Sequence, residues 1–435
     1  MDHADVLVAG AGPGGCAAAL GFARRGARVR LLEPPPGPHE RLAGEWLHPG
    51  GVAALRRLGV PLDDPRFCTN RGFVVHPGPG EPAIALPFGE GAAVSVSHSV
   101  LTRVLRECAA QANVAFVESR VVGGRPSHGE VETPSGPLRA QVIVGADGRG
   151  SSVRSALRGR HAPSVALSHT AGVLLTGAEL PREGFGHLFL GGPGPVLAYR
   201  VGVDAVRVCV DVPRGAGAPG SALDYLRHSC APVLPAALRA HFLARLSPYD
   251  VQWAANRFQR RADYGSGRCA LVGDAVGHTH PLTAVGMSLA LLDGECLGRS
   301  ASLRAYVRER TARTWSVEHL AAGLHRVLTG QDEASRALRR GLLHLWRHQP
   351  QERARSLALL GMTDTRRRSF LACTAAVAGS AATTHMGSLR TPRPGPSPAR
   401  LLGPLLSWLG WLMGPSVGVP PPLSAASPVI AGGPA

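Results

Sequence analysis

Residues 5–33 read DVLVAGAGPGGCAAALGFARRGARVRLLE, and this stretch decides the fold. Its spacing predicts an apolar strand over residues 5–9, a helix over residues 16–25 and a second strand over residues 27–32. Together they form a complete βαβ unit, the opening unit of a Rossmann-like domain with a parallel sheet. The chain is therefore predicted to be an α/β protein.

The loop between the first strand and the helix has the spacing of a dinucleotide-binding motif. Glycines at such a loop let the backbone approach a pyrophosphate, and the helix N-terminus holds the negative charge. Glu33 ends the second strand 18 residues after Gly15, where an acid accepts from ribose hydroxyls. An acid there favours an unphosphorylated adenosine ribose, as in FAD or NAD. The loop residues are Gly10, Gly12, Pro13, Gly14 and Gly15.

A second stretch, residues 269–298, reads CALVGDAVGHTHPLTAVGMSLALLDGECLG. It predicts a short strand, a break at Gly273 and Asp274, a proline-containing loop and an apolar helix from Ala284. We expect Asp274 to be a buried carboxylate that accepts from ligand hydroxyls, because a buried charge needs partners. A strand–loop–helix unit with a surface aspartate is the alternative.

A third stretch begins with an apolar strand over residues 142–144 and continues as ADGRGSSVR over residues 146–154. In flavoprotein hydroxylases such a turn sits beside the nucleotide, with the aspartate, here Asp147, bonding locally. An N-capped helix without a ligand is the alternative for this stretch.

Composition restricts the remaining choices. At 435 residues the chain can form two domains or one large composite. The formal charge is +17, yet the arginines are scattered and no nucleic-acid motif accompanies them, so a membrane surface is the expected anionic contact and nucleic acid is not. The eight cysteines are far apart without a CxxC pair, which indicates a reducing compartment. Without a charged leader and apolar segment at the N-terminus, we expect a cytoplasmic protein.

The expected organisation is an FAD-binding domain with an inserted antiparallel-sheet substrate domain and a helical C-terminal region. The apolar run at residues 401–413 is shorter than the ~20 residues that span a bilayer. It fits an interfacial membrane anchor, or a helix packed on the core or on a partner subunit. The expected bounds are 1–165 and 262–300 for the FAD-binding domain, with 72–98 joining the substrate sheet, 166–261 for the substrate domain, 301–390 for the helical region, and 391–435 for a Pro-rich linker and apolar tail.

Three separated nucleotide-site stretches, with a sheet inserted between the last two, resemble the FAD-dependent monooxygenases of the para-hydroxybenzoate hydroxylase fold. The details are most similar to squalene monooxygenase (squalene epoxidase). Residues 44–51, GEWLHPGG, are similar to that family's GExLQPGG, and residues 273–291 are similar to its GDAxNMRHPLTGGGMTVAL. Residues 194–199 and 208–212 are similar to its SPVLxYQ…RVLVD sheet, and the chain ends in helices with an apolar tail, as in that family. The resemblance covers roughly residues 4–300.

This resemblance implies one FAD site that draws on all three stretches. The ADP half would lie on the glycine loop and Glu33, with Arg41 reaching the phosphates and Val121 the adenine. Asp274 would bond the ribityl or pyrophosphate region. The isoalloxazine ring would lie against the start of the last helix. The expected cofactor-binding residues are Gly10, Gly12, Pro13, Gly14, Gly15, Glu33, Arg41, Val121, Asp147, Asp274, Pro281, Gly286 and Met287.

The chain departs from the family's pattern near the reacting edge of the flavin. It has His48 in place of a glutamine, Phe88 in place of a tyrosine, and Ala284 and Val285 in place of two glycines. No acid–base pair is expected, and the candidates near the flavin are His48, Phe88 and His280, with ordinary loop histidines as the alternative. We expect no metal, because His278 and His280 lack a nearby third ligand in the sequence.

The function that the resemblance implies is insertion of one oxygen atom from O₂ into a lipophilic alkene through a C4a-hydroperoxyflavin. The expected substrates are squalene-, terpenoid- or polyene-like, and NAD(P)H is the expected ultimate electron donor, directly or through a flavin or NADPH reductase. An NAD(P)H-dependent aromatic hydroxylase of the same fold and a flavin-dependent prenyl-chain reductase remain alternatives. A flavin halogenase is disfavoured, because the chain has no lysine and no WxWxIP stretch.

Overall fold

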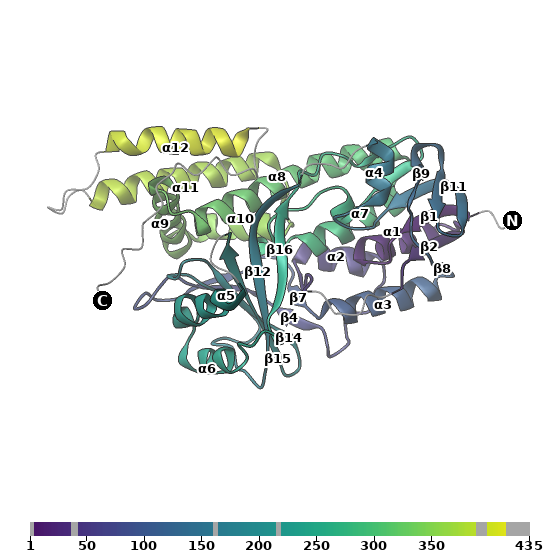
Figure 1. Ribbon diagram of the computed structural model, residues 1–435. Helices are drawn as coiled ribbons and strands as arrows, with labels where there is room; N and C mark the ends of the chain where they lie inside the picture. Colours follow the sequence, from purple (N-terminus) through teal and green to yellow (C-terminus); the bar gives the residue numbers. More distant parts are fainter. Residues whose placement is uncertain (1–3, 36–41, 160–163, 215–218, 389–397, 415–435) are drawn as a thin grey trace.

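The computed structural model describes residues 4–35, 42–159, 164–214, 219–388 and 398–414. The N-terminal βαβ unit lies at one end of the molecule and helices α9 to α12 gather at the other (Figure 1). The sheet that holds this unit lies at the same end, and the long strands β12 and β16 of a second large sheet stand near the middle. The predicted Rossmann-like unit, antiparallel sheet and helical C-terminal region are therefore all present.

An eight-stranded sheet forms the first body, and its five central strands are parallel. Three of them, at residues 4–9, 29–33 and 269–271, are short and mostly buried, as expected where a sheet is covered on both faces. Val8, for example, pairs with Leu31 on one side and Val144 on the other. In spatial order the central strands are β18 (Cys269–Leu271), β11 (Gly136–Gly145), β1 (Ala4–Ala9), β2 (Val29–Glu33) and β8 (Ala115–Glu118), flanked by β17 (Gly265–Ser266), β10 (Glu130–Thr133) and β9 (Gly123–Arg125).

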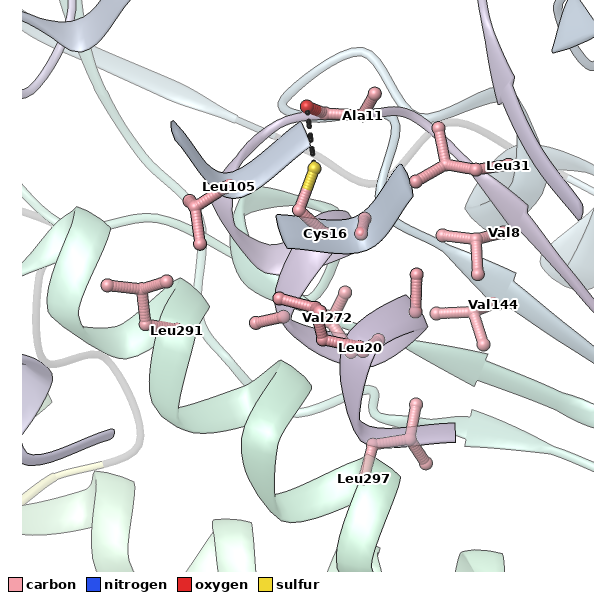
Figure 2. Packing of buried hydrophobic residues seen from close by; sticks show 14 of the residues in the cluster. Val8, Ala11, Cys16, Leu20, Leu31, Leu105, Val144, Val272, Leu291 and Leu297 are labelled. Carbon is pink, nitrogen blue, oxygen red and sulfur yellow. Dashed lines mark hydrogen bonds between the residues drawn. The ribbon is translucent and has the colours of Figure 1, made fainter. Parts of the chain in front are cut away.

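Helix α1 (Pro13–Ala23) packs against this sheet, and α7 (Gly286–Arg299) packs side by side with α1. Leu20 of α1 lies between the sheet and the α7 side chains Leu291 and Leu297 (Figure 2). Their backbones touch at glycines: a Cβ on Gly21 would lie 2.7 Å from the Cα of Gly298. We call this contact, with Gly294 against Gly14, the glycine seam. The helix predicted from Ala284 begins instead at Gly286, because Ala284 adopts a left-handed φ of 52° that a helix cannot contain.

A seven-stranded, mostly antiparallel sheet forms the second body. One face carries the apolar side chains that pack against α5 (Pro219–Tyr225) and α6 (Ala236–Ala244), and the other faces the C-terminal helices. In spatial order its strands are β16 (Gln252–Phe258), β12 (Val165–Thr176), β15 (Ala205–Pro213), β14 (Val196–Gly202), β13 (Gly186–Phe189), β5 (Gly72–His76) and β6 (Ile84–Pro87).

The chain before β12 also forms a small three-stranded sheet and three further helices. The sheet is β3 (Trp46–Leu47), β7 (Ala93–Ser95) and β4 (Cys68–Asn70), and the helices are α2 (Pro49–Arg57), α3 (His98–Gln111) and α4 (Ser152–Arg158).

The C-terminal region is helical, and its last described helix packs on the others. Trp408 and Leu412 of this helix are buried in the same apolar cluster as Leu328 and Trp346. That contact matches the core-packed alternative for residues 401–413. Within the described ranges, no helix is both long and apolar enough to cross a bilayer. The helices are α8 (Leu303–Thr329), α9 (Glu333–His348), α10 (Pro350–Leu360), α11 (Arg367–Ser388) and α12 (Pro398–Met413).

Candidate cofactor and substrate site

The carboxyl ends of the parallel strands bring the three predicted stretches to one edge of the sheet. Gly10 follows β1, Glu33 ends β2, Ala146 follows β11 and Gly273 follows β18. A Cβ on Gly10 would lie only 2.5 Å from the Ala146 carbonyl oxygen, so the first and third stretches are in direct contact. Ligands of open α/β sheets bind outside this edge.

The glycine loop leaves the N-terminus of α1 open. Gly12 precedes the helix without a side-chain cap, and a Cβ placed on Gly12 would meet no heavy atom within 4 Å. Gly15, in contrast, is required by packing, since its Cβ would lie 1.9 Å from the Gly10 carbonyl oxygen. The amides of a first helical turn lack partners within the helix and attract anions. The loop therefore has the form of a phosphate cradle.

Glu33 lies directly beside this cradle. One carboxylate oxygen accepts from the Ala11 amide at 2.5 Å, and the other accepts from Arg106 at 2.8 Å. Its side chain keeps 32% of its surface exposed, which leaves it accessible to a ligand.

Asp147 and Asp274 have different environments. Asp147 bonds locally, accepting from the Ser151 hydroxyl and from the Val153 amide at 3.1 Å, so it supports the start of α4. The expectation that Asp274 is buried was wrong: 32% of its side chain is exposed, and Arg149 donates to it at 3.2 Å. A long arginine from the third stretch reaches across the strand end and compensates the charge.

A buried ion cluster supports the Asp274 turn from behind, and the sequence analysis missed it. Asp293 of α7 accepts from Arg261, from Arg310 at 2.7 Å and from the Gly273 amide at 2.9 Å. Arg261 also donates to the Gly273 and Gly277 carbonyls at 3.0 and 2.7 Å. The signal in the sequence was a charged residue within an apolar helix, because such a residue must be paired.

His48 is fully buried beside the turn that leads into α7. Its Nε2 lies 2.8 Å from the Thr283 carbonyl oxygen, and its amide donates to the Ser288 hydroxyl at 2.9 Å. Burial lowers the pKa of His48 to about 4, although the bond to Thr283 acts in the opposite direction. The neutral ring thus donates from Nε2, and its Nδ1 has no partner among the described residues. Phe88 lies edge-on to this ring at 6.3 Å.

The start of α7 is open in the same way as α1. Val285 provides no side-chain cap, and a Cβ on Gly286 would meet nothing within 4 Å. Met287 is buried against Gly44, where a Cβ would lie 2.8 Å from the methionine Cγ. The GEWLHPGG segment is anchored to the second sheet by Glu45, which accepts from Arg207 at 2.9 Å through both oxygens.

His280 has neighbours that its sequence context did not suggest. Asp211 of β15 and His325 of α8 lie close enough that one atom of each residue falls within 4.8 Å of the others. The expectation that no third ligand lies nearby was therefore wrong for His280. His278 lies apart, 3.4 Å from the Ser164 hydroxyl, and burial lowers its pKa to about 4.

The remaining predicted residues are less informative. Val121 is buried just after β8, and Pro281 is exposed at the start of the turn into α7. Arg41 lies outside the described residues.

An apolar cavity lies against the turn that precedes α7. It encloses about 1090 Å³ of empty space, counting the part that opens to solvent. Leu282, Thr283 and Ala284 form one wall, the second sheet forms another, and helices α8 to α12 form the rest. Other lining side chains include Phe73, Leu197, Leu324, Trp346, Phe370 and Trp408. The lining is almost wholly apolar, so the cavity suits an apolar molecule.

Comparison with known proteins agrees with this arrangement. Residues 139–392 match the family model described as squalene epoxidase. Squalene epoxidase erg1 of Aspergillus fumigatus is 30% identical over 380 residues, covering 78% of each chain. Squalene epoxidase 2, mitochondrial, of Arabidopsis thaliana is 30% identical over 66% of this chain, but the match spans only 52% of its own length.

Solved structures share the fold at lower identity. The flavin-dependent brominase Bmp2 superposes with a TM-score of 0.70 at 16% identity, covering 90% of this chain and all of its own. PqsL of Pseudomonas aeruginosa, in complex with 2-aminobenzoylacetate, superposes with a TM-score of 0.66 at 22% identity, over 76% of this chain and 97% of its own. The chain therefore belongs to the squalene epoxidase family, and with it to the FAD-dependent monooxygenases.

Proposed function

We propose that the strand-end cradle binds FAD and that the apolar cavity binds a lipophilic alkene. The pyrophosphate would lie over the open space at Gly12, with Glu33 on the adenosine ribose and Asp274 on the ribityl or pyrophosphate region. The N-termini of α1 and α7 carry no side-chain caps, and each favours negative charge. These residues fit the cofactor.

The flavin ring would lie at the start of α7. His48 Nδ1 and Thr283 Oγ1 are buried there without partners among the described residues. Buried polar atoms normally form hydrogen bonds, so these two are available to a bound group. Bound FAD, once reduced, supplies the activation of O₂.

The single observation that carries the substrate class is the position and lining of the cavity. Its wall at Leu282–Ala284 is the turn that precedes α7, so a guest in the cavity would be separated from the cofactor site by only this turn. An almost wholly apolar lining favours a hydrocarbon chain, since burial of apolar surface contributes ~25 cal/mol per Å². We propose epoxidation of a squalene-, terpenoid- or polyene-like alkene. One atom of O₂ enters the double bond, and the other leaves as water with two electrons and two protons.

NAD(P)H is the proposed ultimate source of these electrons, directly or through a flavin or NADPH reductase. The basic surface and the C-terminal helices are proposed to bring the protein to a membrane that holds its substrate, as a peripheral contact.

The cofactor proposal is tested by Gly12→Ala. The added methyl group meets no protein atom, so the fold should be unaffected, while the phosphates lose their approach to the backbone. We expect FAD affinity to fall at least ~10-fold with an unchanged Tm. Gly379→Ala in α11, where a Cβ also meets nothing within 4 Å, is the control. Equal FAD affinity in the two variants would contradict the proposed cradle.

The reaction is tested by incubating FAD-loaded protein with NADPH, a flavin reductase, ¹⁸O₂ and a panel of polyenes and aromatics. We expect an epoxide of a long polyene that carries one ¹⁸O atom. A phenol would instead identify an aromatic hydroxylase, and a reduced alkene formed without O₂ would identify a prenyl-chain reductase.

A further inference from the structure

We propose that His280 is a positioning residue that fixes the turn between the cofactor cradle and the apolar cavity. By holding this turn, the buried His280 side chain would align the substrate with the cofactor, which rests on the proposed function. Its basis is a hydrogen-bond network that joins β12, β15 and β16 to the turn preceding α7.

The network holds the His280 ring from the sheet side. Its Nε2 lies 2.8 Å from the Ser168 hydroxyl and 3.2 Å from the Asp211 carboxylate. Asn256 donates to both Ser168 and Asp211, at 2.8 and 3.1 Å. The network is buried, and none of its side-chain polar atoms lacks a hydrogen-bond partner; its members are Ser168, Asp211, Asn256 and His280. A fully satisfied buried network of this kind specifies one conformation.

The other ring nitrogen holds the turn. His280 Nδ1 accepts from the Leu282 amide at 3.2 Å. An imidazole that accepts at Nδ1 must donate from Nε2, which matches the acceptors that the sheet presents. His280 therefore connects the second sheet to the backbone of residues 281–283, and replacing either nitrogen breaks that connection.

The turn is held from its opposite side as well. The Thr283 carbonyl accepts from His48, whose own amide donates to Ser288 in the first turn of α7. Leu282, Thr283 and Ala284 line the cavity. Two histidines thus hold the turn, His280 from the second sheet and His48 from the residue before α2. A displacement of ~1 Å in such a position can reduce turnover ~10²-fold.

A metal site does not explain the cluster as well. The rings of His280 and His325 stack at 3.9 Å with an interplanar angle of 23°, so their nitrogens cannot both direct lone pairs at one ion. The Leu282 amide also occupies Nδ1, which leaves the proton on Nε2, the atom that faces Asp211. Burial lowers the pKa of His325 to about 3, so its ring is neutral and packs against the face of the His280 ring.

Two conservative substitutions test the two sides of the His280 ring separately. His280→Gln places an amide near Nε2 and removes the acceptor for the Leu282 amide. Asp211→Asn keeps the shape of the sheet side and weakens the charge that orients the ring. The control is His187→Gln, a buried histidine in the same sheet whose partners are Arg182 and His76.

We expect His280→Gln to accelerate amide hydrogen exchange of residues 282–285 at least ~10-fold, a readout that needs no turnover. We also expect product per O₂ consumed to fall at least ~10-fold, with FAD affinity within about threefold of the wild type. Asp211→Asn should shift both readouts in the same direction, and it keeps the test available if His280→Gln does not fold.

If His280→Gln has the same hydrogen exchange in the turn and the same product per O₂ consumed as His187→Gln, the proposal is wrong. The proposal is also wrong if exchange becomes faster while product per O₂ consumed is unchanged, because the turn would then not align the substrate with the cofactor. If the wild-type protein forms no product, the proposed function fails, whereas the exchange measurement still decides whether His280 holds the turn.

Discussion

Asp293→Asn should destabilise the protein far more than the loss of one surface charge would. The carboxylate is completely buried and accepts from two buried arginines, Arg261 and Arg310, and from the Gly273 amide. An asparagine there leaves both guanidinium groups without a counter-charge and points an amide N–H₂ at one of them. Removing one partner of a buried ion pair typically costs ~3–5 kcal/mol. That is a large part of the ~5–15 kcal/mol that stabilises an ordinary domain.

Urea unfolding followed by circular dichroism measures this loss, with Asp5→Asn as the control. Asp5 pairs with Arg28 on the surface, where 66% of the arginine side chain is exposed, so its removal should cost much less than the loss of Asp293. FAD binding is a second readout. A ligand at 100 times its Kd raises the free energy of unfolding by ~2.7 kcal/mol. Because Asp293 also fixes the Gly273 amide, FAD at 100 times its wild-type Kd should stabilise the variant by less than this amount. An Asp293→Asn protein within ~1 kcal/mol of the control would refute the argument that this cluster supports the turn.

Three further predictions address the cavity, the buried histidine and the last helix. Leu324→Trp should raise the KM for long polyenes at least ~10-fold at unchanged FAD affinity, because the larger ring fills the cavity from α8; steady-state kinetics over chain lengths checks this. Acidification from pH 7.5 to 5 should lower the unfolding free energy by ~2 kcal/mol through His48, because folding lowers the pKa of this residue from 6.5 to about 4. This stabilisation is complete above pH 6.5 and is lost as the pH falls towards 4. His48→Gln should remove that part of the pH dependence, and an unchanged dependence would contradict the assignment. Trp408→Ala should cost ~3–5 kcal/mol in urea unfolding, whereas Leu406→Ala, at a side chain 60% exposed, should cost under ~0.5 kcal/mol; equal effects would show that α12 does not pack as described.

The sequence predicted the parts of the molecule that depend on local spacing. The strand, glycine loop and helix of residues 5–33 are encoded within one short segment, so their pattern was sufficient. The family resemblance and the FAD-dependent monooxygenase class were confirmed by comparison with known proteins. The residue-by-residue cofactor site stays a prediction that FAD binding to variants will test.

The sequence could not predict contacts between distant segments. The exposure of Asp274 depends on Arg149, which lies more than a hundred residues earlier. The neighbours of His280 come from a strand and a helix on either side of it in the chain, and neither carries a motif that marks it. The late start of α7 depends on the left-handed backbone of Ala284, a residue type that ordinarily favours helix.

The glycine seam between α1 and α7 has a consequence for how new substrates could be accommodated. Helices in contact through bare backbone, as at Gly21 and Gly298, tolerate no added methyl group and cannot slide past each other. The two helices are therefore fixed relative to each other, and changes in shape are easier to accommodate at the other end of the molecule. Helices α9 to α12 supply a large part of the cavity wall and contact neither the seam nor the Asp293 cluster, so exchanging these helices for those of a relative should change the molecule that the cavity accepts without disturbing the glycine loop.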